Sequence, residues 1–127
     1  MIKELRAETL RWLTERVNNR GNCYCDFAPE HDNSETLIAF NITSINPIFD
    51  LQNQGTLLKF DVEIFINSKN RENIDEIAED LMNDDIGTSE IFEHIFYREF
   101  KDLDFAPKLD NYYCSVLTLN VKAVYDK

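Results

Sequence analysis

The sequence predicts an α+β protein in which a mostly antiparallel sheet carries two main helices packed on one face. Residues 56–67 alternate apolar and more polar side chains with a period of two, which is typical of a strand with one buried and one wet face. A wet face favours an antiparallel sheet, because parallel sheets are normally covered on both sides. Residues 2–18 and 70–83 each carry one apolar stripe at helical spacing. Each helix can therefore bury only one side, which places both on the same face of the sheet.

The elements are expected in the order helix, strands, helix, strands. The first helix ends where two asparagines and a glycine follow, and Asn70 is placed to cap the second helix. The expected strands are rich in β-branched and aromatic residues, and they cover 22–27, 36–43, 56–67, 95–101 and 112–126. The expected loops are 28–35, 44–55 and 102–111, with a short helical turn at 89–94.

Length and composition point to a single domain over residues 1–127, of which 43% are hydrophobic. No apolar run approaches the length of a membrane span, and the first residues lack the apolar core of a signal peptide. We therefore expect a protein of the cytoplasm, or one assembled from it, with no membrane partner.

The charge balance is strongly acidic, with 24 Asp and Glu residues against 13 Lys and Arg and a net charge of −11. Such a field repels phosphate backbones, so sequence-reading contacts with DNA or RNA are not expected. The carboxylates form either an ordinary solvated surface or a surface past which DNA slides without binding.

Catalytic and metal-binding patterns are not found. Nucleophilic catalysis normally needs a histidine beside the nucleophile, and neither His31 nor His94 lies in a recognisable motif. Cys23 and Cys25 form a CxC pair near His31, with Cys114 far along the chain, and this spacing is not that of a zinc site. We expect no enzyme activity, no cofactor and no metal, and three cysteines make a disulfide framework improbable.

One segment suggests a contact with another protein. The turn-rich residues 44–55 carry four large apolar side chains, Ile45, Ile48, Phe49 and Leu51. If the segment projects, these side chains form an exposed patch of the kind that binds a partner. The alternative is that the segment folds back as a lid over the edge of the sheet.

The layout resembles the tail terminator (tail completion) proteins of long-tailed phages, including the lambda-type terminator. The matching elements follow one another along nearly the whole chain: VNNRG at the end of the first helix, TLIAFNIT, LLKFDVEIFIN, NRENIDEIAEDLMN, HIFYREFK and YYCSVLTLNVKAVY. The resemblance lies in this pattern of elements and includes no diagnostic motif.

The resemblance implies a structural role at the head–tail junction of a virion, assembled in the host cytoplasm. A homo-hexameric ring would cap the tail tube protein, stop its polymerisation and present a surface to the head connector, while DNA passes through the hole without specific binding. Two alternatives fit the same composition: another neck or head-completion protein, and an acidic inhibitor that mimics DNA.

Overall fold

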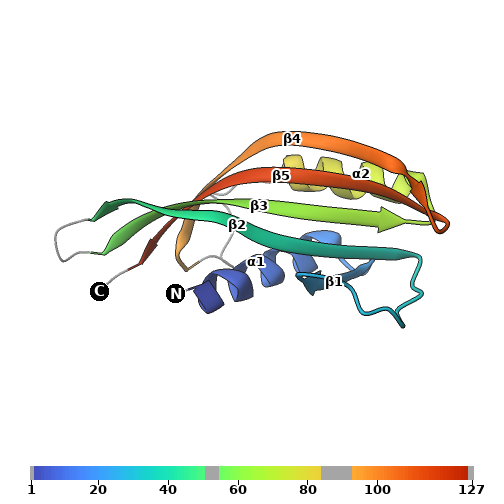
Figure 1. The fold of residues 1–127 in the computed structure, drawn as a ribbon, viewed down its shortest axis with the longest axis horizontal. Coiled ribbons are helices and arrows are strands. Elements are labelled where there is room, and N and C mark those ends of the chain that lie inside the picture. The colour runs from blue at the N-terminus through green and yellow to red at the C-terminus, as the bar shows by residue number, and fades with distance from the viewer. Residues whose placement is uncertain (1, 51–54, 84–92, 126–127) are drawn as a thin grey trace.

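The fold is a long twisted sheet with two helices against it (Figure 1). A computed structural model describes residues 2–50, 55–83 and 93–125. The elements in chain order are α1 (Ile2–Val17), β1 (Asn22–Cys25), β2 (Thr36–Asp50), β3 (Thr56–Ser68), α2 (Arg71–Met82), β4 (Ile95–Leu109) and β5 (Tyr112–Tyr125). The strand order is β1-β2-β3-β5-β4; β1 runs parallel to β2, and the other three pairs are antiparallel. The predicted α+β class with a mostly antiparallel sheet is therefore confirmed.

Both helices pack on the same face of the sheet, as predicted. The strands bury alternate residues against them, because successive side chains of a strand point to opposite faces. The buried side chains that form one core cluster include Leu58, Phe60, Val62, Ile64 and Ile66 of β3 and Leu117, Leu119, Val121 and Ala123 of β5. The helices contribute Leu5, Trp12, Leu13 and Val17 from α1 and Ile74, Ile77, Ala78 and Leu81 from α2. Each such side chain contributes about 1.5–3 kcal/mol when fully buried, so this layer holds the fold together.

Short-range signals set the helix ends. Asn70 accepts a hydrogen bond on Oδ1 from the backbone N of Glu72 at 3.0 Å and so caps α2, as predicted. At the other helix, Arg20 donates from Nε to the carbonyl of Val17 at 2.8 Å. The same guanidinium lies 2.7 Å from the Asp80 carboxylate, which ties the end of α1 to α2. None of the described helices has the length and apolar character needed to cross a membrane.

The prediction of loops at 44–55 and 102–111 is wrong, because most of these residues continue strands. Residues 44–50 extend β2, and residues 102–109 extend β4. The register of β2 against β3 shifts between Thr43 and Asn46, with Ser44 at a φ of 54°, so the turn-forming residues make a bulge inside the strand. Pro107 is accommodated because β4 is an edge strand, where a missing N–H need not break a ladder bond. The predicted helical turn at 89–94 lies mostly outside the described residues, and the first strand ends at Cys25 instead of residue 27.

Candidate assembly surfaces

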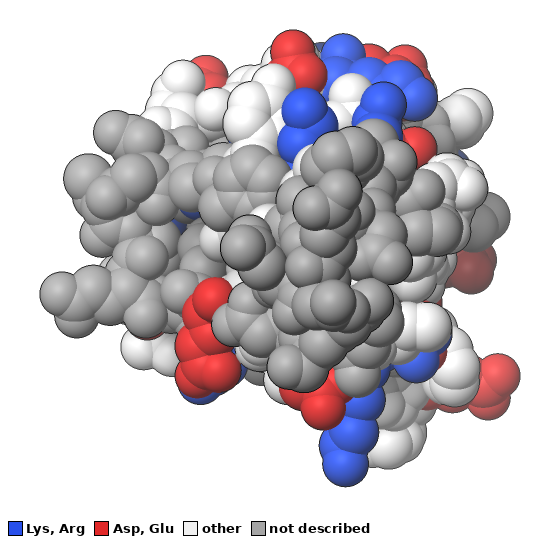
Figure 2. All heavy atoms as spheres, turned by 90° about the vertical axis from the view of Figure 1, so that its left-hand side faces the viewer, with Lys and Arg blue, Asp and Glu red and all other residues white. Residues whose placement is uncertain are grey.

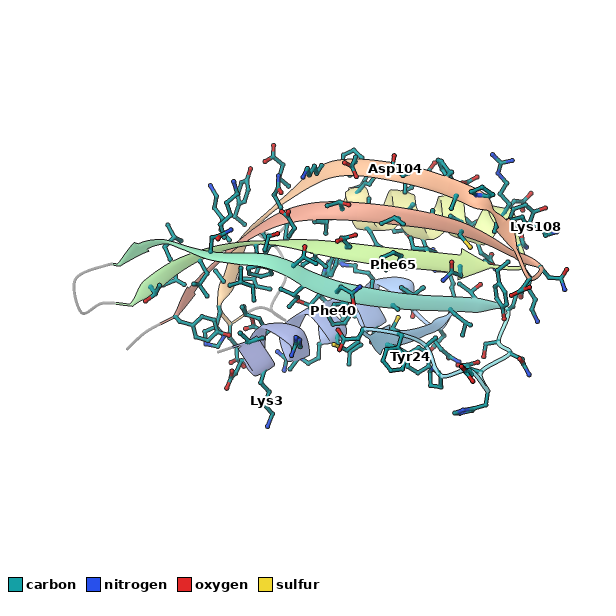
Figure 3. All side chains as sticks on the ribbon, viewed as in Figure 1. Lys3, Tyr24, Phe40, Phe65, Asp104 and Lys108 are labelled. Atoms are coloured by element: carbon teal, nitrogen blue, oxygen red, sulfur yellow. The ribbon has the colours of Figure 1, made fainter. Side chains whose placement is uncertain are left out.

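The sheet face that the described helices leave uncovered is banded by charge. The strand register aligns its side chains in rows across β2, β3, β5 and β4. Three successive rows are Ala39–Phe65–Val116–Asp104, Asn41–Glu63–Thr118–Asp102 and Thr43–Asp61–Asn120–Glu99. Figure 3 labels Phe65 and Asp104 on this face and the buried Phe40 on the helix side. We call Asp61, Glu63, Glu99, Asp102 and Asp104 the acidic band.

The acidic band borders a shallow groove of about 470 Å³. Its lining includes Asp61, Glu63, Asp102 and Asp104, and the one lysine among the described lining residues is Lys101. The carboxylates that line the groove repel one another and also repel phosphate groups, so the groove is unsuited to holding nucleic acid. The surface fits a role in which a polyanion passes without binding.

A narrower basic band follows the acidic one. Lys59 and Lys122 stand opposite each other on β3 and β5, and Tyr97 of β4 completes the row. The ammonium group of Lys122 lies 4.7 Å from the centre of the Tyr97 ring, a cation–π contact that orders the lysine. Viewed from the end of the molecule at which both termini lie, several Lys and Arg side chains stand on the β4 side with Asp and Glu side chains among them (Figure 2).

Both edges of the sheet have backbone N–H and C=O groups that are available to pair with another strand. β4 lies at one edge over its full length. At the other edge β1 pairs only with residues 37–40 of β2, so the rest of β2 has no strand beside it among the described residues. Exposed edges of this length are templates for another strand. Each edge also carries exposed aromatic side chains: Phe100 (44% exposed) and Phe105 (60%) on β4, and Phe27 (76%) after β1.

Phe27 lies at the start of the loop between β1 and β2, and hydrogen bonds to Asp32 hold this loop. The Asp32 carboxylate accepts hydrogen bonds from the Ser34 hydroxyl (2.5 Å), the Tyr24 hydroxyl and the Asn22 amide (3.1 Å). These bonds, the Ser34 hydroxyl first, hold the pKa of Asp32 far below its usual range. Beside the loop lies a groove of about 290 Å³ that Phe27 and Phe65 help to line. The groove is also lined by the polar residues Asp26, Asn41 and Asn67.

The structure describes the predicted contact segment 44–55 only in part. Ile45 belongs to β2, is half-buried and packs against the core cluster. Ile48 and Phe49 belong to β2 by their backbone, but their side chains lie outside the described residues, as does all of Leu51. The contact role of this segment stays a prediction.

The cysteines are not gathered into one site. Cys23 and Cys25 lie on β1 and Cys114 on β5, with β2 and β3 between, and none of the three forms a disulfide. Burial raises the pKa of Cys23 to about 11. Among the described residues (2–50, 55–83 and 93–125), the possible metal ligands that converge are Glu8, Glu93 and His94. This group includes neither a cysteine nor His31.

These surfaces define an α+β protein with one uncovered acidic sheet face and two edges open to strand pairing. No known protein family matches the chain, and no curated protein sequence matches it. Among solved structures, the chain is similar to one from the virion of a native gene transfer agent particle, with a TM-score of 0.56 at 11% sequence identity. The similarity covers 89% of this chain and 84% of the other, so the two share a fold over nearly their whole lengths.

Proposed function

We propose that this chain is a virion structural protein of the phage type and acts as a tail terminator. In this role it forms a homo-hexameric ring on the last ring of the tail tube, stops tube polymerisation and joins the tail to the head connector. The observation that carries the proposal is the shared fold with a chain of a gene transfer agent virion over 89% of this sequence. The order of elements that resembles tail terminators adds the specific role.

The two open edges supply a way to close the ring. The β4 edge of one copy would pair with the free part of β2 in the next copy, with the exposed Phe100 and Phe105 of β4 at the contact. Because the two edges are different surfaces, the contact is head-to-tail, and such contacts close into rings when the rotation between copies permits. The segment 44–55 would dock on a neighbouring copy or on the tube.

The acidic band suits the wall of the hole. With the helices outside, the uncovered sheet face would surround the passing DNA and present Asp61, Glu63, Asp102 and Asp104 to it. Repulsion between these carboxylates and the phosphates would keep DNA from sticking during its passage. The net charge of −11 acts in the same direction.

Native mass spectrometry at micromolar concentration tests the proposal, on the chain alone and mixed with its cognate tail tube protein. We expect a hexamer, in the mixture at least, and tubes of limited length when the chain is present during their polymerisation. A hexamer that leaves tube length unchanged would point to another neck or head-completion protein. A monomer or dimer in both samples would refute the ring and favour an acidic inhibitor.

A further inference from the structure

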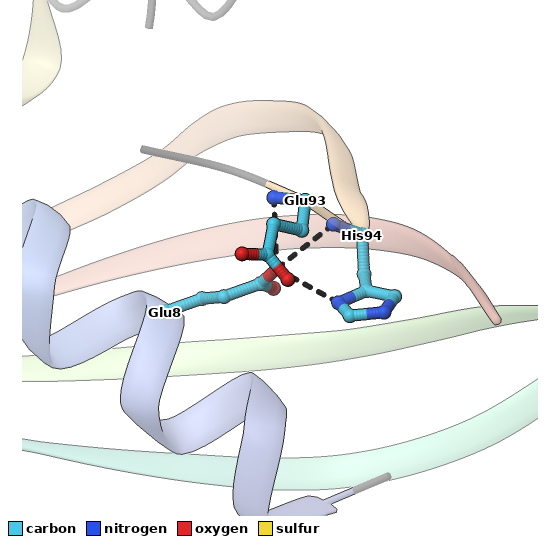
Figure 4. A group of neighbouring side chains, drawn as sticks. All are labelled: Glu8, Glu93 and His94. Carbon is cyan, nitrogen blue, oxygen red and sulfur yellow. Dashed lines mark hydrogen bonds and ion pairs between the residues drawn. The ribbon is translucent and has the colours of Figure 1, made fainter. Parts of the chain in front are cut away.

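Two carboxylates and an imidazole converge where α1 meets the start of β4 (Figure 4). Glu8 is 4% exposed, and its Oε1 accepts three hydrogen bonds of 2.8 Å, from the backbone N of Glu93, the backbone N of His94 and Nδ1 of His94. These bonds join the helix to the segment that leads into the edge strand. They also fix the orientation of the Glu8 carboxylate.

The second oxygen of Glu8 has no such partner. Its Oε2 is buried and accepts no hydrogen bond from the residues that the structure describes. A buried carboxylate oxygen without a donor is costly, and in native proteins it usually marks a bound ion or water. The Glu93 carboxylate faces Glu8 across this space, so two like charges meet with one of them out of solvent. A positive charge between them would remove both costs.

Tyr125 of β5 packs against the imidazole of this cluster. The Tyr125 ring stacks on the His94 ring with centroids 4.2 Å apart and an angle of 8° between planes. This stacking holds the imidazole in place beside the carboxylates, so the ligand atoms are already gathered before any ion arrives.

We propose that Glu8, Glu93 and His94 form a site for a divalent transition metal, with zinc the best fit. One ligand atom from each residue lies within 4.8 Å of the other two. Zinc bonds of about 2.0–2.2 Å at tetrahedral angles need ligand atoms roughly 3.3–3.5 Å apart, so small side-chain shifts suffice. Two carboxylates and one imidazole leave a fourth position for water, and the imidazole disfavours magnesium and calcium, which prefer oxygen ligands alone.

The hydrogen bonds already present would support the bound metal. The backbone N–H groups of Glu93 and His94 would continue to orient Glu8 through Oε1, as outer-shell donors do around metal ligands. His94 would give the metal its Nδ1, and the proton of the neutral ring would then sit on Nε2. The metal would link α1 to the segment that leads into β4. This role does not depend on the proposed ring.

Titration calorimetry and thermal melting of the purified, chelator-stripped chain test the site with zinc and with magnesium. We expect one zinc per chain, a higher melting temperature with zinc, and no response to magnesium. Cobalt in place of zinc should bind without a thiolate charge-transfer band, which separates this site from the cysteines. A strong thiolate band, or no binding of zinc to the native chain, would overturn the proposal.

Glu93→Gln is the discriminating variant, because Glu93 contributes to the Glu8 hydrogen bonds only through its backbone N. The metal-free variant should melt at the temperature of the native chain or slightly above it, because the substitution removes the repulsion with Glu8. Its zinc affinity should fall by more than about 100-fold, since even an outer-shell partner is worth roughly 10- to 100-fold. Glu99→Gln, an exposed carboxylate on the outer row of β4, is the matched control and should bind zinc normally. Equal zinc affinity in Glu93→Gln and Glu99→Gln would also overturn the site.

Discussion

The substitution Phe105→Lys isolates the proposed contact between neighbouring copies. Phe105 lies on the edge strand β4, opposite Ser115 of β5, and 60% of its surface is exposed. It is therefore available to a second molecule while contributing only part of its area to the fold of its own chain. A lysine at this position would be tolerated by the monomer, because its ammonium group can reach water from an edge strand.

The expected loss of assembly free energy follows from the exposed area of Phe105. Complete burial of a phenylalanine contributes about 1.5–3 kcal/mol, so covering the remaining 60% at an interface is worth about 1–2 kcal/mol. A closed hexamer contains this contact six times, and the ring would therefore lose about 6–12 kcal/mol. That loss is large enough to shift the hexamer to monomers at micromolar concentration.

Sedimentation velocity and native mass spectrometry measure the assembly, and circular dichroism melting reports on the fold. We expect Phe105→Lys to leave monomers and to melt within a few degrees of the native chain. Ile2→Lys is the matched control, because Ile2 is an exposed apolar residue (44%) that lies on α1 and not on an edge strand, and it should leave the ring intact. If Phe105→Lys assembles as well as the native chain, the β4 edge is not the interface.

Three further predictions use other parts of the molecule. Phe49→Asp should weaken assembly while the monomer keeps its fold, because the segment 44–55 is proposed to dock on a neighbour or the tube; unfolding of the variant in circular dichroism would instead make the segment a core lid. Cys23 should react with iodoacetamide at pH 8 about 100-fold more slowly in the native chain than in urea. At this pH, a thiol with a pKa of about 11 has about 100-fold less thiolate than one with the ordinary pKa of 9.0. Peptide mass spectrometry measures both rates, and equal rates would show that the thiol is not buried in solution. Asn70→Ala should lower stability by about 1 kcal/mol through loss of the cap on α2, and the control Asn70→Asp should retain it; equal melting of the two variants would contradict the capping role.

Some of this fold was readable from local sequence alone. The alternation in residues 56–67 predicts which side of β3 is buried, and Leu58, Phe60 and the other apolar members of that set do line the core. The cap at Asn70 was also predictable, because capping joins a side chain to a backbone group only two residues away. These features depend on neighbours in the chain, so the sequence determines them without knowledge of the rest of the molecule.

The strand lengths depended on the order of strands in the sheet. Asn46, Pro47 and Pro107 are turn and strand-breaking signals, yet all three lie inside strands. A proline is tolerated where its missing N–H faces away from a partner strand, which requires an edge. Because β4 and the second part of β2 are edges only by virtue of the tertiary arrangement, local patterns could not separate a bulged edge strand from a loop.

The candidate sites were decided by the tertiary structure. The acidic band takes its carboxylates from β3 and β4, which are not paired with each other, and only the register through β5 brings Glu63 into one row with Asp102 and Asp61 into one row with Glu99. The Glu8–Glu93–His94 cluster joins residues 85 and 86 positions apart. The sequence by itself determined the elements, the buried side of each and the excess of negative charge. Which charges face one another depends on how distant segments pack. Coulomb and hydrogen-bond interactions join residues that are close in space, and such pairs produce no periodic pattern along the sequence.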